Sequence, residues 1–309
     1  MGGSGGGRYS GPSSEDIQQR IERAREQERQ RLDGQVNDLL QRLLARFNDR
    51  DKDKIGDRLS DIESCLTGRV EIDRILFGGS VAKHTDVDGL SDVDALVVLD
   101  RENLAGKPPK EMLDTFLETL RDNLSGRGDI RSIEKGHLAI TVTYDDGLEI
   151  QLLPALRSGQ TISIAAADGS SWSDTKPRIF ERELTELNTR LNFTLVPTIK
   201  LFKSIVSTFP EQKRLSGYHI ENLLVHAAKD YRGVKTTYQA LLLHALDHAS
   251  QRILKPLPDV TGQSRTVDAY LGPTDSLERR NISLALSGMK RRLQAATTVS
   301  QWRAVLEDS

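Results

Sequence analysis

The chain has 309 residues, 37% of them hydrophobic and 28% charged, which predicts a globular protein of one large or two ordinary domains. The formal net charge of −2 excludes a global basic field for nucleic acid, so any contact with a polyanion must be local. The single cysteine, Cys65, excludes a disulfide framework, and no apolar run reaches the roughly 18 residues of a membrane span. We therefore expect a cytoplasmic protein with no membrane partner and no stable nucleic-acid partner.

The beginning of the chain predicts a tail followed by a long helix. Residues 1–14 are rich in glycine and serine and lack the apolar core of a signal peptide, so we expect a flexible tail. Ser13 or Ser14 is suited to cap a helix that continues to Phe47. This helix is charged in its first half and amphipathic in its second half.

The next part of the chain mixes predicted strands with one helix. The helix is expected at residues 109–124, where proline stands at the start. The last two strands are expected to pair antiparallel through a hairpin turn at Asp146 and Gly147. Apolar and alternating runs predict the strands at residues 75–79, 93–99, 137–146 and 148–156.

After about Trp172 the sequence has helical periodicity only. Helices are predicted at residues 178–191, 196–209, 217–231, 237–253, 276–296 and 301–308. The fold class expected from this order is α+β and bilobal, with a central cleft of the kind that commonly binds ligands. The predicted boundaries are a tail at 1–14, an α/β lobe with the N-terminal helix as a brace at 15–170, and a helical lobe at 171–309.

Two aspartates interrupt one of the predicted strands directly after a Gly-Gly-Ser turn. Asp92 and Asp94 lie two residues apart, so in a strand they point to the same side. Taken alone, this pair is best read as solvated acids at a strand end. The turn Gly78-Gly79-Ser80 changes that interpretation, because its backbone amides and hydroxyl can bind phosphate oxygens. A phosphate-binding turn, an eleven-residue spacer and two metal-binding acids form a specific pattern.

This GGS-x11-DVD pattern resembles the signature of the DNA polymerase β-type nucleotidyltransferase superfamily. Within it, the chain is similar to the cGAS/DncV-like nucleotidyltransferases, the bacterial second-messenger oligonucleotide cyclases of anti-phage CBASS systems. The resemblance runs from about residue 30 to the C-terminus and includes LEIQLLPAL, SGYHIENL and DVTGQSRTVDAYLG. It implies a polymerase β-like lobe, with a mixed sheet and helices, followed by a helical lobe.

The resemblance implies two Mg²⁺ ions, or Mn²⁺ in their place, that are held by carboxylates during nucleotidyl transfer. Asp92 and Asp94 are the first two expected ligands, and the family takes a third acid from a neighbouring strand. That position is Gln151 here, and a neutral amide binds a divalent cation weakly. Glu149 lies two residues earlier on the same side, so we expect it to be the third catalytic metal ligand. The alternative is that Glu149 is a surface acid and that two aspartates hold the metal.

The resemblance also suggests residues that grip the nucleotide. Gly79, Ser80 and Gln151 are expected beside it in the first lobe. Lys200 and Lys203 lie three apart on one helix face, and one of them, in preference Lys203, is expected to meet the triphosphate. The alternative for both is a solvated basic stripe.

The start of the helix at 217–231 supplies two more candidates. Ser216 precedes this helix and is placed to donate to a phosphate at its N-terminus. Tyr218 can stack on a base, unless it is a core tyrosine. The polar loop 261–272 either lines the cleft or braces the lobes, and Arg265 and Asp268 within it form a candidate structural pair.

The function expected is an enzyme that condenses NTPs, with ATP favoured, into a cyclic di- or trinucleotide second messenger and releases pyrophosphate. Two alternatives stay open: nucleotidyl transfer to an RNA, protein or small-molecule acceptor, and a catalytically weak nucleotide-binding sensor. The near-neutral charge argues against RNA extension, and Gln151 keeps the sensor open. The expected partners are NTP substrates and a regulatory protein, and the expected oligomeric state is a monomer.

Overall fold

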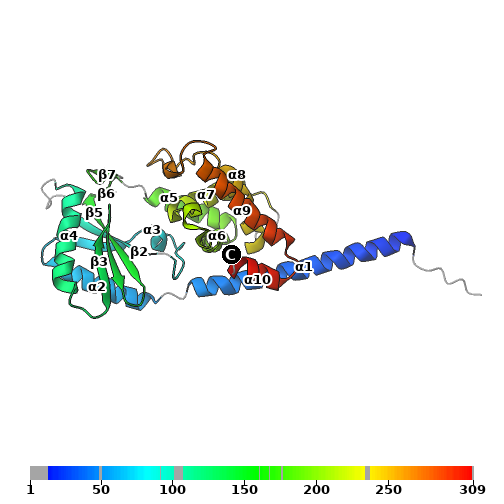
Figure 1. The fold of residues 1–309 in the computed structure, drawn as a ribbon, viewed down its shortest axis with the longest axis horizontal. Helices are drawn as coiled ribbons and strands as arrows, with labels where there is room; N and C mark the ends of the chain where they lie inside the picture. Colours follow the sequence, from blue (N-terminus) through cyan, green and yellow to red (C-terminus); the bar gives the residue numbers. More distant parts are fainter. Residues whose placement is uncertain are drawn as a thin grey trace, which may run out of the picture.

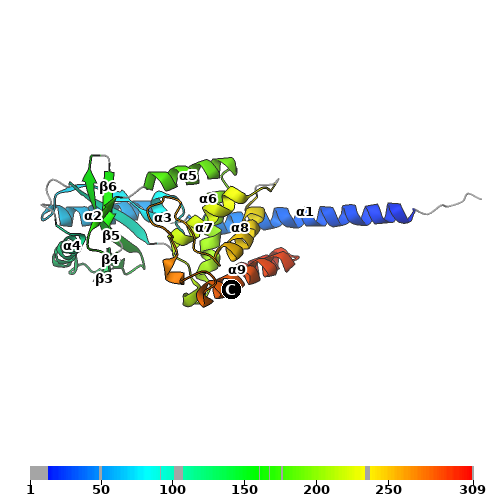
Figure 2. The same cartoon turned by 90° about the horizontal axis from the view of Figure 1, so that it is seen from above.

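The computed structural model has a lobe built around a sheet, a helical lobe beside it, and one long helix whose first half projects away from both (Figures 1 and 2). In the part of the chain that is described, no helix is both long and apolar enough to cross a membrane. The structure describes residues 13–48, 51–90, 92–100, 107–159, 161–166, 168–174, 177–233 and 237–307.

The first lobe is organised by a mixed sheet with the strand order β1-β2-β5-β4-β3. β2 and β5 are parallel neighbours, while the other pairs are antiparallel. β6 pairs with the second half of β5 and also with β7. The mixed sheet confirms the predicted fold class. Its strands are β1 (Ile72–Phe77), β2 (Val93–Asp100), β3 (Ile130–Lys135), β4 (Ile140–Tyr144), β5 (Glu149–Ser158), β6 (Thr161–Ala165) and β7 (Trp172–Asp174).

The sheet buries its apolar residues against two helices, α2 (Lys52–Thr67) and α4 (Pro109–Leu124), which belong to the same hydrophobic cluster as the central strands. Each strand of the parallel pair contributes to this cluster at alternate positions, as expected for a sheet with one covered face. The short helix α3 (Gly79–Ala82) lies between β1 and β2 in the chain, at the side of the sheet that faces the helical lobe (Figures 1 and 2). The sheet thus carries the Gly-Gly-Ser turn to the boundary between the lobes.

The second lobe is a helical cluster around one hydrophobic core. The N-terminal helix α1 (Ser14–Phe47) begins at Ser13, whose side chain and that of Asp16 form a capping box. The second half of α1 buries its apolar face in this core, next to α6, α8 and α10. The other helices are α5 (Pro177–Arg190), α6 (Leu195–Ser207), α7 (Gly217–Asp230), α8 (Tyr238–Arg252), α9 (Leu277–Ala295) and α10 (Val299–Glu307), with short 3₁₀ turns at Glu211–Lys213 and Ala269–Leu271.

The packing of α1 bears on the expected brace. Its buried face belongs to the helical lobe, although the expected domain scheme grouped it with residues 15–170. At its end it also meets the first lobe, because the Asp88 amide donates a 3.0 Å hydrogen bond to the Phe47 carbonyl. The domain boundaries 1–14, 15–170 and 171–309 therefore stay a prediction. The buried residues of α1, the expected brace, pack in the helical lobe. Residues 1–12 of the expected tail lie outside the described residues.

Candidate active site

The junction of β1, α3 and β2 presses the Gly-Gly-Ser turn against the second aspartate of the motif. The Gly78 amide donates a 2.8 Å hydrogen bond to the Asp94 carbonyl, and Gly79 has a φ of +51°. A Cβ atom on residue 79 would lie 1.6 Å from Oδ2 of Asp94, so only glycine lets the carboxylate rest on the turn. The Ser80 backbone also hydrogen-bonds to Asp94. The turn and the acid are one structural unit.

A cavity of about 690 Å³ opens between the lobes at this unit, and we refer to it as the central cavity. Asp92 and Asp94 both line it, as the two-residue alternation of an extended chain predicts. The first lobe contributes the turn, the two aspartates and their neighbours, and the helical lobe contributes α6 and the start of α7. Its polar lining residues are Gly79, Ser80, Lys83, Asp92, Asp94, Gln151, Lys203, Ser207, Arg214, Ser216, Gly217, Tyr218 and Glu221.

The electrostatics at Asp94 favour a cation. Burial raises the pKa of Asp94 above its usual range, although Lys83 and Lys203 lower it and Glu221 adds to the increase. The cost of burying this carboxylate is therefore not fully offset by the lysines beside it. A divalent ion, which prefers carboxylate oxygens, would offset it.

The neighbouring strand brings Gln151 into hydrogen-bond contact with Asp92, whereas Glu149 meets Asp92 only as a lining residue of another cavity. Gln151 is the parallel-strand partner of Asp94, and its Nε2 donates a 2.6 Å hydrogen bond to Oδ2 of Asp92. Glu149 lines a separate cavity of about 500 Å³, which it shares with Asp92. Within the described ranges, no three His, Cys, Asp or Glu side chains form a group that could hold a metal. The expectation that Glu149 completes a three-carboxylate site therefore finds no support in this geometry.

The two candidate lysines of α6 open into different cavities. Lys203 lines the central cavity. Lys200 lines another cavity, of about 840 Å³, which has Val81 and Ala82 of α3 in its wall. Lys200 Nζ donates a 2.6 Å hydrogen bond to Asn48 Oδ1 and lies 3.7 Å from Asp86 Oδ1. Lys200 and Lys203 are close on α6 but lie on different sides of α3. Lys200 therefore does not reach the central cavity that contains Asp92 and Asp94.

The start of α7 places two further candidates in the wall of the central cavity. Ser216 is the N-cap of α7, and its Oγ accepts a 3.3 Å hydrogen bond from the His219 amide. The Tyr218 side chain is 37% exposed, and its hydroxyl donates a 2.7 Å hydrogen bond to Oδ1 of Asp259. Burial and this hydrogen bond raise the pKa of Tyr218 to about 12, so the phenol stays protonated. An anchored ring with an exposed face suits stacking on a base.

Sequence reasoning missed a buried ionic cluster beside the turn. Glu221 of α7 is 1% exposed; its Oε1 accepts a 2.9 Å hydrogen bond from Lys203 and a 2.5 Å hydrogen bond from the Thr85 hydroxyl, and its Oε2 accepts one from Lys83. Burial raises the pKa of Glu221, but the two lysines and the hydrogen bonds outweigh burial, so the pKa lies below its usual value. Lys203 was the one member of this cluster that the sequence suggested. Of the others, Lys83 has a local signal, because it lies three residues after Ser80 and hence on the same side of one helical turn.

The loop 261–272 braces the helical lobe. Asp268 and Arg279 are both fully buried and form an ion pair of 2.6 Å, so the suggested partner Arg265 was wrong. The Tyr270 hydroxyl lies 2.8 Å from Nδ1 of the buried His219 at the start of α7. None of the residues described as lining the central cavity comes from this loop.

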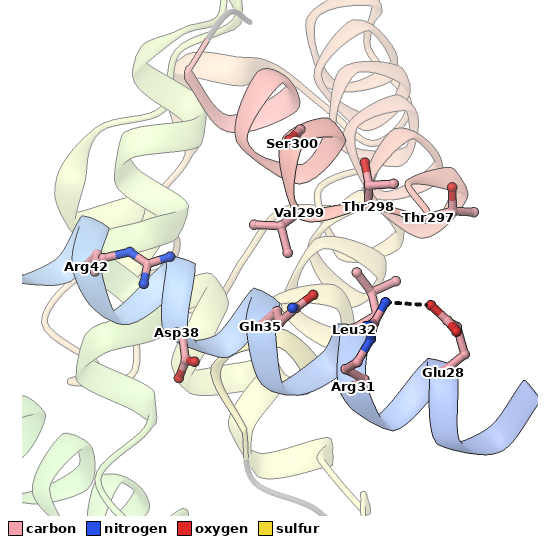
Figure 3. A pocket seen from close by; sticks show the side chains of 10 residues that line it. All are labelled: Glu28, Arg31, Leu32, Gln35, Asp38, Arg42, Thr297, Thr298, Val299 and Ser300. Carbon is pink, nitrogen blue, oxygen red and sulfur yellow. Dashed lines mark hydrogen bonds and ion pairs between the residues drawn. The ribbon is translucent and has the colours of Figure 1, made fainter. Parts of the chain in front are cut away.

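A further cavity, of about 530 Å³, lies between α1 and α10 (Figure 3). Residues of α1, among them the ion pair of Glu28 and Arg31 at 2.9 Å, form one wall of this cavity, and residues 297–300 form the other. It contains neither a phosphate-binding turn nor a pair of adjacent acids. The central cavity is therefore the candidate active site.

Comparison with known proteins identifies the class to which this fold and site belong. Residues 31–188, just over half of the chain, match the family model of the Second Messenger Oligonucleotide or Dinucleotide Synthetase domain. No curated protein sequence matches the chain.

Solved structures of this class share the fold. CdnC of E. coli MS115-1, solved with ATP, is 17% identical, with a TM-score of 0.61 over 83% of this chain and 90% of that one. The same CdnC in complex with HORMA-deltaN gives 15% identity, a TM-score of 0.58 and coverage of 82% and 89%. A mutant of the di-nucleotide cyclase DncV of Vibrio cholerae, solved with ATP and GTP, gives 10% identity, a TM-score of 0.60 and coverage of 96% and 92%.

The fold is thus that of the cGAS/DncV-like nucleotidyltransferases, whose polymerase β-like lobe the chain shares. By the match over residues 31–188, the chain belongs to the second messenger oligonucleotide or dinucleotide synthetase family. The family resemblance expected from the GGS-x11-DVD pattern is confirmed, and with it the prediction of a nucleotidyltransferase-type enzyme.

Proposed function

We propose that this protein is a Mg²⁺-dependent nucleotidyltransferase that condenses NTPs, ATP among them, into a cyclic di- or trinucleotide. The observation that carries the proposal is the pair Asp92 and Asp94 beside the Gly79 turn, in a cavity shared by the two lobes. The family match over residues 31–188 supports the same reaction class.

The residues present fit a divalent metal. Asp92 and Asp94 offer carboxylate oxygens, and the buried Asp94 is not fully neutralised by nearby lysines. The Nε2 group of Gln151 holds one Asp92 oxygen by a hydrogen bond. We assign the two aspartates as the metal ligands, with Mg²⁺ as the favoured ion and Mn²⁺ as a substitute. When bound, such ions polarise the α-phosphate and stabilise the charge that develops during phosphoryl transfer.

The reaction forms one bond and breaks one bond at phosphorus. A sugar hydroxyl of one nucleotide forms an O–P bond with the α-phosphate of another, the bond to the β-phosphate oxygen breaks, and pyrophosphate leaves while the hydroxyl proton passes to solvent. A transfer of the same kind within the linear product closes the ring, after one intermolecular transfer for a dinucleotide or two for a trinucleotide.

The chain's own residues orient the substrates for this reaction. The glycine backbone at residue 79 allows phosphate oxygens to approach closely, and Ser80 and Ser216 offer hydroxyl groups from opposite lobes. The exposed face of Tyr218 is the candidate platform for a base. Because groups from both lobes line one cavity, the relative position of the lobes decides whether the reacting atoms meet.

We further propose that the product is a second messenger in anti-phage defence, made in the cytoplasm by a monomer under the control of a regulatory protein. The structure of CdnC with HORMA-deltaN, which is similar in fold to this chain, supports a protein partner.

One observation favours a second function, a catalytically weak nucleotide-binding sensor. Gln151 occupies the place beside the aspartates where the resemblance implies a third acid, and Glu149 lines another cavity. Two carboxylates bind metal more weakly than three, so a site of this kind retains nucleotide binding while its metal-dependent turnover is slow.

One experiment separates these functions. The protein is incubated with each labelled NTP, alone and in pairs, with Mg²⁺ or Mn²⁺, and the products are treated with phosphatase and then with nuclease P1. Phosphatase-resistant, internally linked products and released pyrophosphate support the cyclase. Linear RNA-like products would point to another acceptor, and ATP binding without any pyrophosphate, even with Mn²⁺, would support the sensor.

A further inference from the structure

The lysine expected to bind the triphosphate is already fully engaged inside the protein. A lysine ammonium has three N–H donors. Lys203 Nζ lies 3.0 Å from the Thr85 carbonyl, 3.3 Å from the Thr85 hydroxyl and 2.9 Å from Oε1 of Glu221. Its side chain is 8% exposed. In this arrangement Lys203 ties α6 and α7 to the loop after α3.

Lys83 occupies a different position in the same cluster. It follows α3 directly, four residues after Gly79 and three after Ser80, so it lies on the same side of one helical turn as the phosphate-binding residues. It lines the central cavity, and its side chain is 13% exposed. Among the residues that the structure describes, Glu221 is the one acceptor of a hydrogen bond from Lys83. One of the three N–H donors of the ammonium group is therefore used, and the other two are available to a ligand in the cavity.

Two aromatic rings fix the ammonium group of Lys83 without using its donors. Nζ lies 5.0 Å from the centre of the Phe180 ring and 5.3 Å from that of Tyr218. A ring face attracts a cation electrostatically and replaces part of its hydration. The rings themselves are 5.6 Å apart and tilted by 44°, so they form two walls of one pocket around the cation.

Glu221 and Lys203 hold Lys83 in this position. The two Glu221 oxygens are divided between the two lysines, one oxygen each. A buried carboxylate that lost a partner would be costly, so Lys203 keeps Glu221 ionised and in place, and Glu221 aims Lys83 at the cavity. The two lysines together carry one more positive charge than Glu221 neutralises.

We propose that Lys83 is a further nucleotide-binding residue, whose ammonium group meets a phosphate of the nucleotide seated on the Gly79–Ser80 turn, with Glu221 and Lys203 as positioning residues. This inference rests on the proposed nucleotidyltransferase function. It assigns the direct phosphate contact to Lys83, the residue that follows α3, and gives Lys203 of α6 an indirect role through Glu221.

The test compares the affinities for a non-hydrolysable ATP analogue and for adenosine, measured by calorimetry with and without Mg²⁺. Lys83→Met should weaken binding of the ATP analogue about tenfold in both conditions, because a charge-assisted hydrogen bond is lost. Adenosine binding should change less than twofold, since adenosine has no phosphate. Lys83→Arg should restore most of the affinity for the analogue. A matched control is Lys110→Met on α4, an exposed lysine that does not line the central cavity.

A second variant covers loss of folding. Lys83→Met with Glu221→Gln keeps the net charge and leaves no buried carboxylate facing an apolar side chain, and it should lose the analogue to the same extent as Lys83→Met. Glu221→Gln alone should fall between wild type and Lys83→Met. Equal loss of analogue and adenosine, or unchanged analogue binding in either Lys83→Met variant, would overturn the inference. If the wild-type protein bound neither NTP nor the analogue, the proposed function would fail as well. If the wild-type protein is active and Lys83→Met binds the analogue normally, only the role assigned to Lys83 is refuted.

Discussion

Oδ2 of Asp94 lies where a methyl group on residue 79 would have to be, with only 1.6 Å between the carboxylate oxygen and the Cβ position. Gly79→Ala must therefore displace the carboxylate, and it also places alanine at a φ of +51°, which costs roughly 1 kcal/mol or more. Because a misplacement of about 1 Å at a reacting centre can cost a hundredfold in rate, we expect pyrophosphate release to fall by at least about a hundredfold. The measurement is steady-state pyrophosphate release from NTPs.

A glycine elsewhere in the chain provides the control for this change. Gly34 lies on α1, and apart from the nearby backbone of its own helix no atom lies within 4 Å of its Cβ position. Gly34→Ala should leave the rate unchanged and stabilise the helix by up to about 1 kcal/mol. Normal turnover in Gly79→Ala would show that Asp94 does not need the turn against which it rests.

The paired aspartates themselves give the most direct test of the active site. Asp92→Ala with Asp94→Ala should reduce pyrophosphate release by more than about a thousandfold, because several kcal/mol of metal-dependent stabilisation would be lost. The fold should survive, since removal of the Asp94 carboxylate relieves a burial cost. Circular dichroism checks the fold, and the double variant Asp53→Ala with Asp57→Ala, two exposed acids of α2, is the matched control. Retained turnover in the site variant would refute the assignment.

Variants at Gln151 and Glu149 are expected to differ in the Mg²⁺ concentration that they require for activity. Gln151→Glu adds a carboxylate beside Asp92, so we expect half-maximal activity at about tenfold less Mg²⁺. Without metal the same change places like charges together and should lower the melting temperature, which Mg²⁺ should restore. Glu149→Gln, in a neighbouring cavity, should leave the Mg²⁺ dependence unchanged. A tenfold greater Mg²⁺ requirement in Glu149→Gln would restore Glu149 as the third ligand.

Much of the fold could be predicted from the sequence because its signals are local. The long helices from α4 to α10 have clear amphipathic periodicity, and the hairpin of β4 and β5 has a favoured turn, with Gly147 at a φ of +86°. α2 was overlooked, although its apolar residues recur at helical spacing. β3, β6 and β7 were overlooked for a physical reason: they are short strands at or near the sheet's edges, and few of their residues are buried.

The spacing of residues alone indicated only the part of the site that is continuous in sequence, whereas Lys203, Ser216 and Tyr218, which also line the central cavity, were expected from the family resemblance. Gly79, Ser80, Asp92 and Asp94 belong to one continuous motif, so their spacing indicated their chemistry. The bond from Lys83 to Glu221 joins residues 138 positions apart, and no local pattern marks Glu221 as a counter-ion. The same limit explains Lys200: its helix position was right, but the packing of α3 between two cavities decided which cavity it entered.

The buried His219 predicts how stability depends on pH. Burial is the main reason that its pKa falls to about 4; Arg279 also lowers it, and Asp268 opposes the change. In the unfolded chain, histidine takes up a proton near pH 6.5, whereas the folded protein resists protonation until about pH 4. The unfolded state therefore binds more protons in this window, so stability should decrease as the pH falls through it. Between pH 7 and pH 5 this histidine should account for on the order of 2 kcal/mol of lost unfolding free energy.

Denaturant titrations at several pH values measure this dependence as a slope. His219→Gln should flatten the slope between pH 7 and pH 5, whatever its effect on stability at pH 7, because glutamine takes up no proton in either state. His226 and His248, whose pKa values burial also lowers, will leave a residual slope of the same sign. An unchanged slope in His219→Gln would mean that the folded protein accepts a proton on His219. The contact between His219 of α7 and the Tyr270 hydroxyl would then be compatible with a protonated imidazole.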